Sequence, residues 1–344
     1  MRSGLRSSRR IPGCLLLAGL WAMGCSRSSS AAISPSATPA GAPAISGQII
    51  NGVTGQPVPG AAIRIDGLGD TTGAADGSFT LASSGAGASL RAVNVSSPAT
   101  IERSTWAVVP GTALTLSLMP STIDLTAFNQ MFRGNNGELH RWPSAPAVVL
   151  QRRALRFTTL TDSAYTAIAA VMPDAEAEAI LTDLGWALPQ LSGSVFPAFS
   201  NVQRETAAEG DSIAIARPGI VLVALADGLT ASTGFAGYTR WAWNGAGDVV
   251  SAIIVIDRVF DSSASPFRRT VRAHELGHAL GYNHVTAIAS VMNSTATIEP
   301  NTFDLDGARI AFQRPVLNRS PDADPRPAFG TTARSSALTW SGAP

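Results

Sequence analysis

The 344-residue chain has no lysine, only two cysteines and only four histidines. Both cysteines, Cys14 and Cys25, lie near the start, so the rest of the chain has no cysteine pair for a disulfide. Charged residues make up only 14% of the chain and hydrophobic residues 45%, which indicates a globular protein and excludes a disordered one. The length suits two domains.

The apolar run over residues 11–24 is too short to span a membrane as a helix. It follows four arginines and no acidic residue, which predicts a secretory signal over residues 1–24. Removing this signal changes the formal net charge from +1 to 1 − 4 = −3. The mature chain therefore has no basic excess for binding nucleic acid.

Residues 20–25, Leu-Trp-Ala-Met-Gly-Cys, resemble a bacterial lipobox, in which a small residue precedes a cysteine that becomes lipidated. The lipobox prefers leucine where Ala22 stands, and an ordinary signal peptide cut nearby is the alternative. Residues 25–44 are predicted to be a flexible linker of Ser, Ala, Pro, Thr and Gly. Lipidation at Cys25 implies a bacterial cell-envelope lipoprotein, at the outer membrane or cell surface, whereas the alternative implies a secreted protein.

Residues 45–120 contain short β-prone runs separated by turns, which predicts a small all-β sandwich. Ile63, Ile65, Phe79 and Leu81 alternate with polar or small residues, as expected of strands with one buried face. The predicted strands are 46–51, 61–66, 78–83, 89–95, 104–109 and 113–118. Segments 47–49, 55–61 and 76–79 resemble the carboxypeptidase regulatory-like, transthyretin-like sandwich. That resemblance implies a fold and no catalytic residue.

Residues 121–316 are expected to form an α/β domain, because predicted strands alternate with predicted helices. The predicted strands are 147–151, 155–159, 212–216, 219–225, 237–243 and 249–256, and the predicted helices are 164–172, 175–184 and 266–280. Ser265 and Pro266 favour the start of the last helix, since serine caps helices and proline fits the first helical position. Residues 317–344 are predicted to be a disordered tail, because they are rich in Pro, Ser, Asp and Arg.

Three of the four histidines lie within residues 274–284, which read His-Glu-Leu-Gly-His-Ala-Leu-Gly-Tyr-Asn-His. His274 and His278 are four residues apart, so they project from one face of a helix and can bind one zinc ion. Glu275 lies beside that face, where it can accept a proton from water and later donate it to a leaving amine.

Gly281 can adopt a positive φ without a Cβ penalty, so it can end the helix and turn the chain back. His284 can then reach the same metal as His274 and His278. Three protein ligands leave the fourth position of a zinc ion open, which is typical of a catalytic site. The pattern therefore predicts one catalytic Zn²⁺ ion.

This extended pattern resembles the metzincin metallopeptidases and, more loosely, their matrixin-like branch. The resemblance covers residues 145–315 and is strong only around the histidines. It implies a mixed twisted sheet with an active-site helix and a C-terminal helix, the latter beginning in residues 303–310. It also implies a methionine turn, in which Met292 forms a floor under the three histidines and binds no metal. The alternative is that Met292 is an ordinary core methionine.

Two departures from the family's pattern matter. Val285 follows the third histidine where better-known branches carry a serine or an acid, so the branch stays unassigned. The absence of cysteine after Cys25 excludes the cysteine-based latency of the matrixins. Latency, if present, needs another device.

In the family, the substrate backbone pairs with an exposed edge strand above the zinc, and strand 237–243 is the candidate here. Its candidate residues are Tyr238, Thr239, Arg240 and Trp241. The aromatic side chains of this strand could equally belong to the core. The fourth histidine, His140, is expected to be a surface or packing residue.

The expected function is a zinc-dependent endopeptidase that hydrolyses extracellular or surface proteins through zinc-activated water, with Glu275 as general base. Its expected partners are protein or peptide substrates and, through Cys25, a membrane, and the expected state is a monomer. The alternative is a surface-anchored binding or adhesion protein with a non-proteolytic zinc domain.

Overall fold

The computed structural model describes residues 44–82, 87–109, 111, 113–262, 265–327 and 339–342. The predicted signal, Cys25 and residues 25–43 of the linker lie outside these ranges, so the lipobox and its lipidation remain predictions. Among the helices within these ranges, none combines the length and apolar character needed to cross a membrane.

The first seven strands form two small sheets. One sheet has three strands in the order β4-β1-β7, and the other has four in the order β3-β2-β5-β6. The strands are β1 Ala44–Asn51, β2 Ala62–Ile65, β3 Gly69–Thr72, β4 Ser78–Ala82, β5 Ser89–Ser96, β6 Arg103–Val109 and β7 Leu114–Leu118. Ile49, Val93, Val95 and Leu118 are fully buried in the hydrophobic core of these sheets, because alternating side chains face inward.

A larger sheet of eight strands follows, in the order β11-β9-β8-β12-β14-β13-β15, with β10 also paired to β8. Strands β8, β12 and β14 are parallel, whereas β13 is antiparallel to β14. The bounds are β8 Ala147–Arg156, β9 Ala164–Val171, β10 Val202–Glu205, β11 Ser212–Ala214, β12 Ile220–Asp227, β13 Gly237–Trp243, β14 Val249–Asp257 and β15 Thr339–Gly342. The sheet is therefore mixed, as expected.

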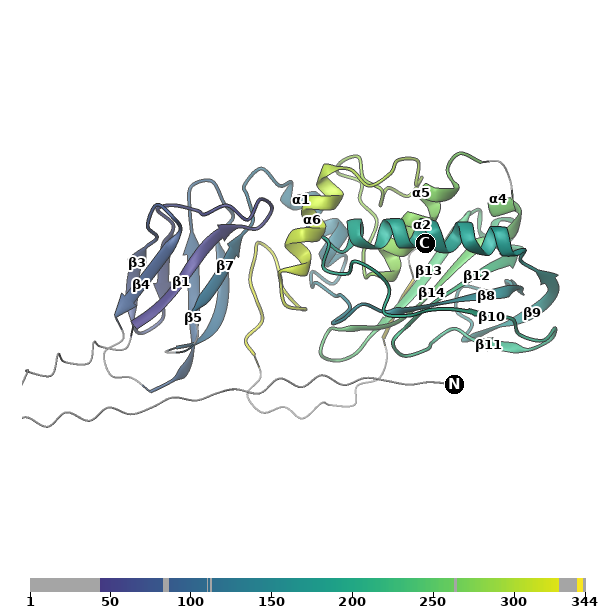
Figure 1. The fold of residues 1–344 in the computed structure, drawn as a ribbon, viewed down its shortest axis with the longest axis horizontal. Helices are drawn as coiled ribbons and strands as arrows, with labels where there is room; N and C mark the ends of the chain where they lie inside the picture. The colour runs from purple at the N-terminus through teal and green to yellow at the C-terminus, as the bar shows by residue number, and fades with distance from the viewer. Residues whose placement is uncertain are drawn as a thin grey trace, which may run out of the picture. The chain divides into compact units, whose positions relative to one another are not determined.

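Two long helices, α2 and α5, lie on the same face of this sheet (Figure 1). Leu184 of α2 and Leu276 of α5 join Ile254 of β14 in one hydrophobic core, and all three side chains are fully buried. The helical segments are α1 Leu125–Phe128, the π-helical turn Asn129–Arg133, α2 Asp174–Leu191, α3 Leu229–Thr233, α4 Arg258–Ser262, α5 Arg268–Ala279 and α6 Thr302–Phe312. A second, smaller core that includes Ile253 and Val255 lies on the opposite face of the sheet.

Two predictions of secondary structure were wrong. The helix predicted at 164–172 is instead strand β9, Ala164–Val171, because Tyr165 and Ala167 alternate with more exposed neighbours and β9 pairs with both β8 and β11. The alanine content favours a helix locally, but pairing within the sheet overrides that propensity. The strand predicted at 147–151 and the start of the one predicted at 155–159 form one strand, β8, which ends at Arg156. Its pairing with β9 has an irregularity between Arg153 and Leu155.

The prediction of disorder from residue 317 onward was also wrong for residues 317–327. Arg314 binds the carboxylate of Asp322 through Nε at 2.7 Å and Nη2 at 2.6 Å, and both side chains are fully buried. Asn318 and Asp324 are buried in the same network. The composition suggested disorder because these residues are polar, but buried polar groups are stable when they are paired.

Candidate metal centre

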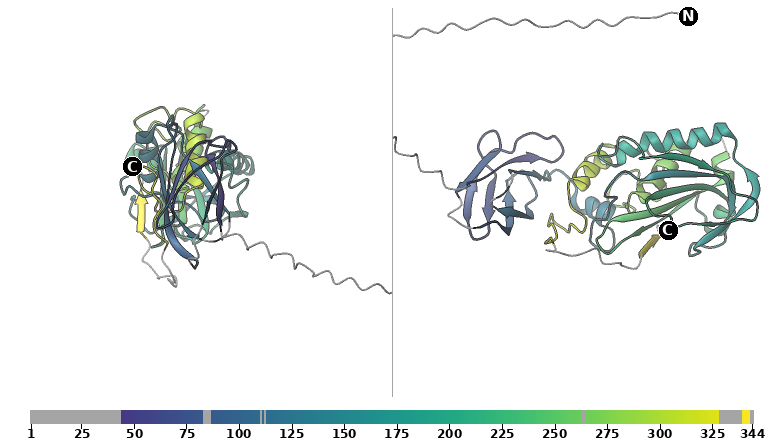
Figure 2. Two further views of the ribbon diagram at one scale, coloured as in Figure 1. Left: turned by 90° about the vertical axis from the view of Figure 1, so that its left-hand side faces the viewer. Right: turned by 60° about the horizontal axis from the view of Figure 1, so that its bottom comes forward.

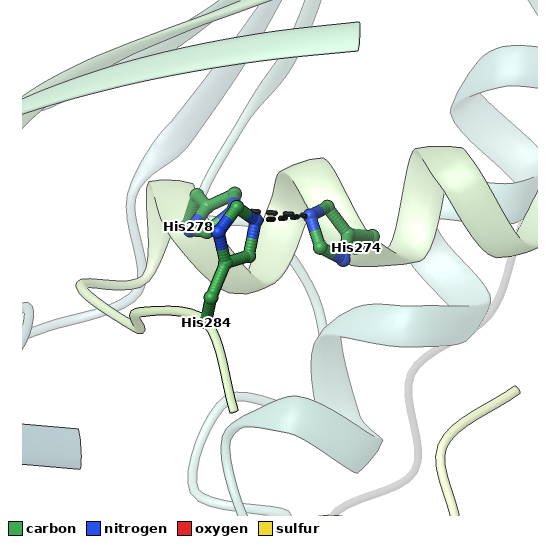
Figure 3. Close-up of side chains that lie close together, drawn as sticks. All are labelled: His274, His278 and His284. Atoms are coloured by element: carbon green, nitrogen blue, oxygen red, sulfur yellow. Dashed lines mark hydrogen bonds between the residues drawn. The ribbon is translucent and has the colours of Figure 1, made fainter. Parts of the chain in front are cut away.

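The side chains of His274, His278 and His284 converge on one point. The first two project from α5, and the third comes from the loop that follows it (Figure 3). Their Nε2 atoms are 3.0 Å apart for His274 and His278, and 3.2 Å apart for the other two pairs. The structure therefore brings together the three predicted ligands in a group that could hold a metal ion.

The outer ring nitrogens of two histidines are fixed by backbone carbonyl groups. The Nδ1 atom of His274 lies 2.8 Å from the carbonyl oxygen of Val291, and that of His278 lies 2.8 Å from that of Tyr282. A carbonyl accepts but cannot donate, so each Nδ1 carries the hydrogen and each Nε2 of a neutral ring presents a lone pair. Burial lowers the pKa of His274 to about 4, which keeps that ring neutral.

The Nε2 lone pairs of His274 and His278 therefore face one another 3.0 Å apart and repel unless a positive centre lies between them, so this donor set fits a metal ion. Four nitrogen ligands placed tetrahedrally about 2.05 Å from zinc lie about 3.3 Å from one another. The observed separations of 3.0 to 3.2 Å are close to that value. The carbonyl partners of Nδ1 are also the outer contacts that orient histidine ligands at metal sites.

Glu275 follows the first histidine on α5, and its side chain is buried. Thr239 of β13 donates its hydroxyl hydrogen to Oε2 of Glu275 at 2.6 Å. Gly237, two residues earlier on β13, leaves room for the carboxylate, because a Cβ at that position would lie 2.5 Å from Oε1 of Glu275. Burial raises the pKa of Glu275 to about 8, against the hydrogen bond from Thr239, which lowers it.

Gly281 ends α5 with a φ of 103°, as the sequence predicted. The amide of Gly281 donates to the carbonyl of His278 at 2.9 Å, and the amide of Tyr282 donates to that of Gly277 at 3.0 Å. These two bonds form a Schellman motif, which terminates a helix through a residue of positive φ. A Cβ on Gly281 would also lie 2.7 Å from the carbonyl oxygen of His140. The position therefore requires glycine for its conformation and for its space.

Met292 is fully buried and packs against Gly277, where its sulfur leaves no room for a side chain. The turn that carries it is tied to the first residues of α6 by Asp304. One carboxylate oxygen of Asp304 accepts from the hydroxyl of Ser290 at 2.5 Å, and the other accepts from the amide of Val291 at 3.0 Å. Because the carbonyl of Val291 binds His274, Asp304 supports one histidine of the candidate site through one intermediate residue.

The four residues expected on the substrate strand have different surroundings. Tyr238 is buried and donates its hydroxyl hydrogen to the carbonyl of Leu160 at 2.9 Å, and Arg240 donates to the carbonyl of Asp162 at 2.6 Å. Thr239 faces Glu275. The ring of Trp241 is buried beside His140, 5.8 Å between centroids. These side chains pack within the protein, so only the backbone of β13 can serve as an edge for a peptide.

His140 is buried, which confirms the packing interpretation over the surface one. Its Nδ1 atom lies 3.0 Å from the carbonyl oxygen of Gly247, and its ring stacks 4.8 Å from that of Trp243. It is not one of the histidines in the converging group.

Sequence reasoning missed the positioning contacts of Glu275 and the support of the Met292 turn. Thr239 lies far from the histidines along the chain, and its contact depends on how β13 packs against α5. Asp304 did carry a signal in the sequence, because Asn301 and Asp304 have the spacing of a helix capping box, which the structure shows.

No protein-family model matches the chain, and no curated protein matches it closely enough to count as a relative.

Proposed function

We propose that this protein is a zinc endopeptidase whose site resembles that of the metzincins. The observation that carries the proposal is the convergence of three Nε2 atoms, from His274, His278 and His284, at separations of 3.0 to 3.2 Å. Such a set provides three of the four ligands of zinc and leaves one position open for substrate, which separates a catalytic from a structural site.

Zinc, when bound, supplies Lewis acidity, which makes water more acidic and polarises a carbonyl group. The protein supplies the proton transfers. Burial favours the neutral form of Glu275, whereas a cation held by the neighbouring histidines would favour its carboxylate. In that ionised form Glu275 accepts a proton from the attacking water and then donates it to the leaving amine. Thr239 holds this carboxylate by its hydroxyl, and Gly237 leaves the space in which it lies. The backbone of β13 beside α5 provides an edge along which an extended peptide is oriented.

The proposal is tested by incubating the zinc-loaded mature protein with denatured casein, with and without a chelator. We expect cleavage that the chelator abolishes. A Glu275→Ala variant should still bind zinc and should cleave at least about 100-fold more slowly, since general-base catalysis contributes factors of that size. Undiminished cleavage by a zinc-loaded Glu275→Ala variant would overturn the assigned role of Glu275.

Absence of cleavage across casein and a peptide library, by protein that demonstrably holds zinc, would favour the alternative of a surface binding or adhesion protein. Products released from peptides blocked at both ends would establish endopeptidase activity and exclude an aminopeptidase.

We further propose that the mature protein is anchored to the bacterial cell envelope through lipidated Cys25 and acts there as a monomer. The resemblance of residues 20–25 to a lipobox supports the anchor. A Cys25→Ser variant should be released from the membrane fraction into the soluble fraction. An unchanged distribution, or a parent protein that never sediments with membranes, would refute the anchor.

A further inference from the structure

Strand β13 is paired along both of its edges. One edge pairs with β14, and the other pairs with the short strand β15, which is formed by residues 339–342 of this same chain. The register joins Arg240 to Gly342 and Trp243 to Thr339. Figure 2 shows β15 as a short yellow arrow beside the large sheet. The edge that the proposed function leaves for a substrate is therefore occupied by a distant segment of the chain.

The geometry of β15 is that of a bound peptide. It is extended and antiparallel to β13, as in peptide recognition by strand addition to an open sheet edge. Its direction runs from Trp243 toward Arg240, so its chain advances toward Thr239, whose hydroxyl holds Glu275. A substrate strand that pairs with the same residues of β13 needs the same backbone donors and acceptors.

We propose that residues 339–342 are a built-in competitor that blocks the peptide-binding edge of β13. This inference rests on the proposed endopeptidase function. Because this segment belongs to the same chain, it competes intramolecularly, at an effective concentration set by the chain and not by the amount of protein. The chain has no cysteine after Cys25, so a thiolate cannot serve as the latency device, and strand addition supplies one that needs no metal ligand.

The test uses two neighbouring proline substitutions in the full mature chain. In an antiparallel ladder, adjacent residues alternate between an N–H that faces the partner strand and one that faces away. One of Trp340→Pro and Ser341→Pro therefore removes a hydrogen bond to β13, whereas the other replaces an N–H that β13 does not use. Each variant is the matched control for the other, and Trp340→Ala and Ser341→Ala control for the loss of the side chains.

We expect one proline variant to lower the KM for a peptide substrate by roughly tenfold or more, with kcat unchanged. The same variant should lose hydrogen-exchange protection at those amides of residues 240–243 that face β15, whereas the amides that face β14 should keep theirs. This readout does not depend on catalysis. The other proline variant and both alanine variants should behave like the parent protein.

Equal KM values and equal exchange in the parent and both proline variants would overturn the proposal, as would equal effects of the two prolines. If one variant lost protection but no form cleaved any peptide, the endopeptidase function and the blocking role would both be refuted, and only the strand pairing would stand. If the parent protein and all variants cleaved the peptide and their hydrogen-exchange protection at β13 were the same, the blocking role would be refuted and the endopeptidase function would stand.

Discussion

At the scale of single residues, the contact between Thr239 and Glu275 determines how the proposed general base is held. The hydroxyl is buried and lies 2.6 Å from the carboxylate, so its removal leaves Oε2 without this partner. A hydrogen bond to a charged group contributes about 1.5–3 kcal/mol. Thr239→Val should therefore lower kcat by about 10- to 100-fold without loss of bound zinc.

The matched control is Thr239→Ser, which keeps the hydroxyl and should retain most of the activity. Metal analysis of each variant separates positioning from loss of zinc. A Thr239→Val enzyme as active as the parent, at equal zinc content, would show that Thr239 does not position Glu275.

Gly281 is expected to be important for both stability and zinc binding. Gly281→Ala should lower the free energy of unfolding by about 1–3 kcal/mol, because φ is 103° there and the Cβ would crowd the carbonyl of His140. Zinc affinity should fall too, since the same turn directs His284. Gly219→Ala is the control, because Gly219 has a φ of 78° but open space around it. Urea unfolding measures the stability of both variants, and zinc titration measures their affinity. Similar losses in both variants would contradict the specific role of Gly281.

At the scale of elements, α6 and the turn of Met292 are joined by one carboxylate. Asp304 binds Ser290 and Val291, and it also accepts from the amide of Asn301 in the capping box of α6. Asp304→Ala should therefore lower the free energy of unfolding by about 2 kcal/mol or more and weaken zinc binding.

Asp306→Ala is the control on the same helix, because the one ion pair of Asp306 among the described residues is with Arg309 at 3.3 Å, and both side chains are partly exposed. That variant should lose about 0.5 kcal/mol or less. Denaturant unfolding of both variants measures the difference, and equal stabilities would mean that Asp304 does not tie the turn to α6.

The elements with a regular apolar pattern were predicted well from the sequence, and those decided by pairing were not. The helix around His274 follows from the residues that start it and from the spacing of its histidines, and the buried strand β14 follows from its run of apolar residues. The role of Gly281 follows from its freedom at positive φ. Strand β9 could not be recognised, because its alanines suit a helix until β8 and β11 lie beside it. Strand β15 has no apolar pattern of its own and depends on the edge of β13.

The same division holds at the site. The three histidines were predictable because they are close in sequence and share one helix and turn. Thr239 and Asp304 contact the site from distant segments, so their roles depend on the packing of whole elements and not on local spacing.

At the scale of the whole molecule, a buried ionic network connects the first seven strands with residues 314–324. Arg314 binds both Asp322 and the hydroxyl of Ser117 on β7, and Arg103 on β6 binds Asp324 at 2.8 Å. Asp322→Ala should lower the free energy of unfolding by about 3–5 kcal/mol, because it leaves the charge of the buried Arg314 guanidinium without the carboxylate that pairs with it.

The control for this prediction is Asp70→Ala. Its carboxylate lies 3.9 Å from Arg64, and both side chains are largely exposed to solvent. Such a pair contributes about 0–1 kcal/mol. Chemical denaturation of both variants compares them, and similar losses would show that the buried network is not a main source of stability.

The proposed function requires the imidazoles of His274, His278 and His284 to share one zinc ion. It is tested most directly by calorimetric titration of zinc into the metal-free protein and into a His284→Ala variant. We predict one zinc ion per chain for the parent protein and much weaker binding for the variant, which loses one of three protein ligands. A parent protein that binds no zinc, or a His284→Ala variant that binds it equally tightly, would contradict the claim.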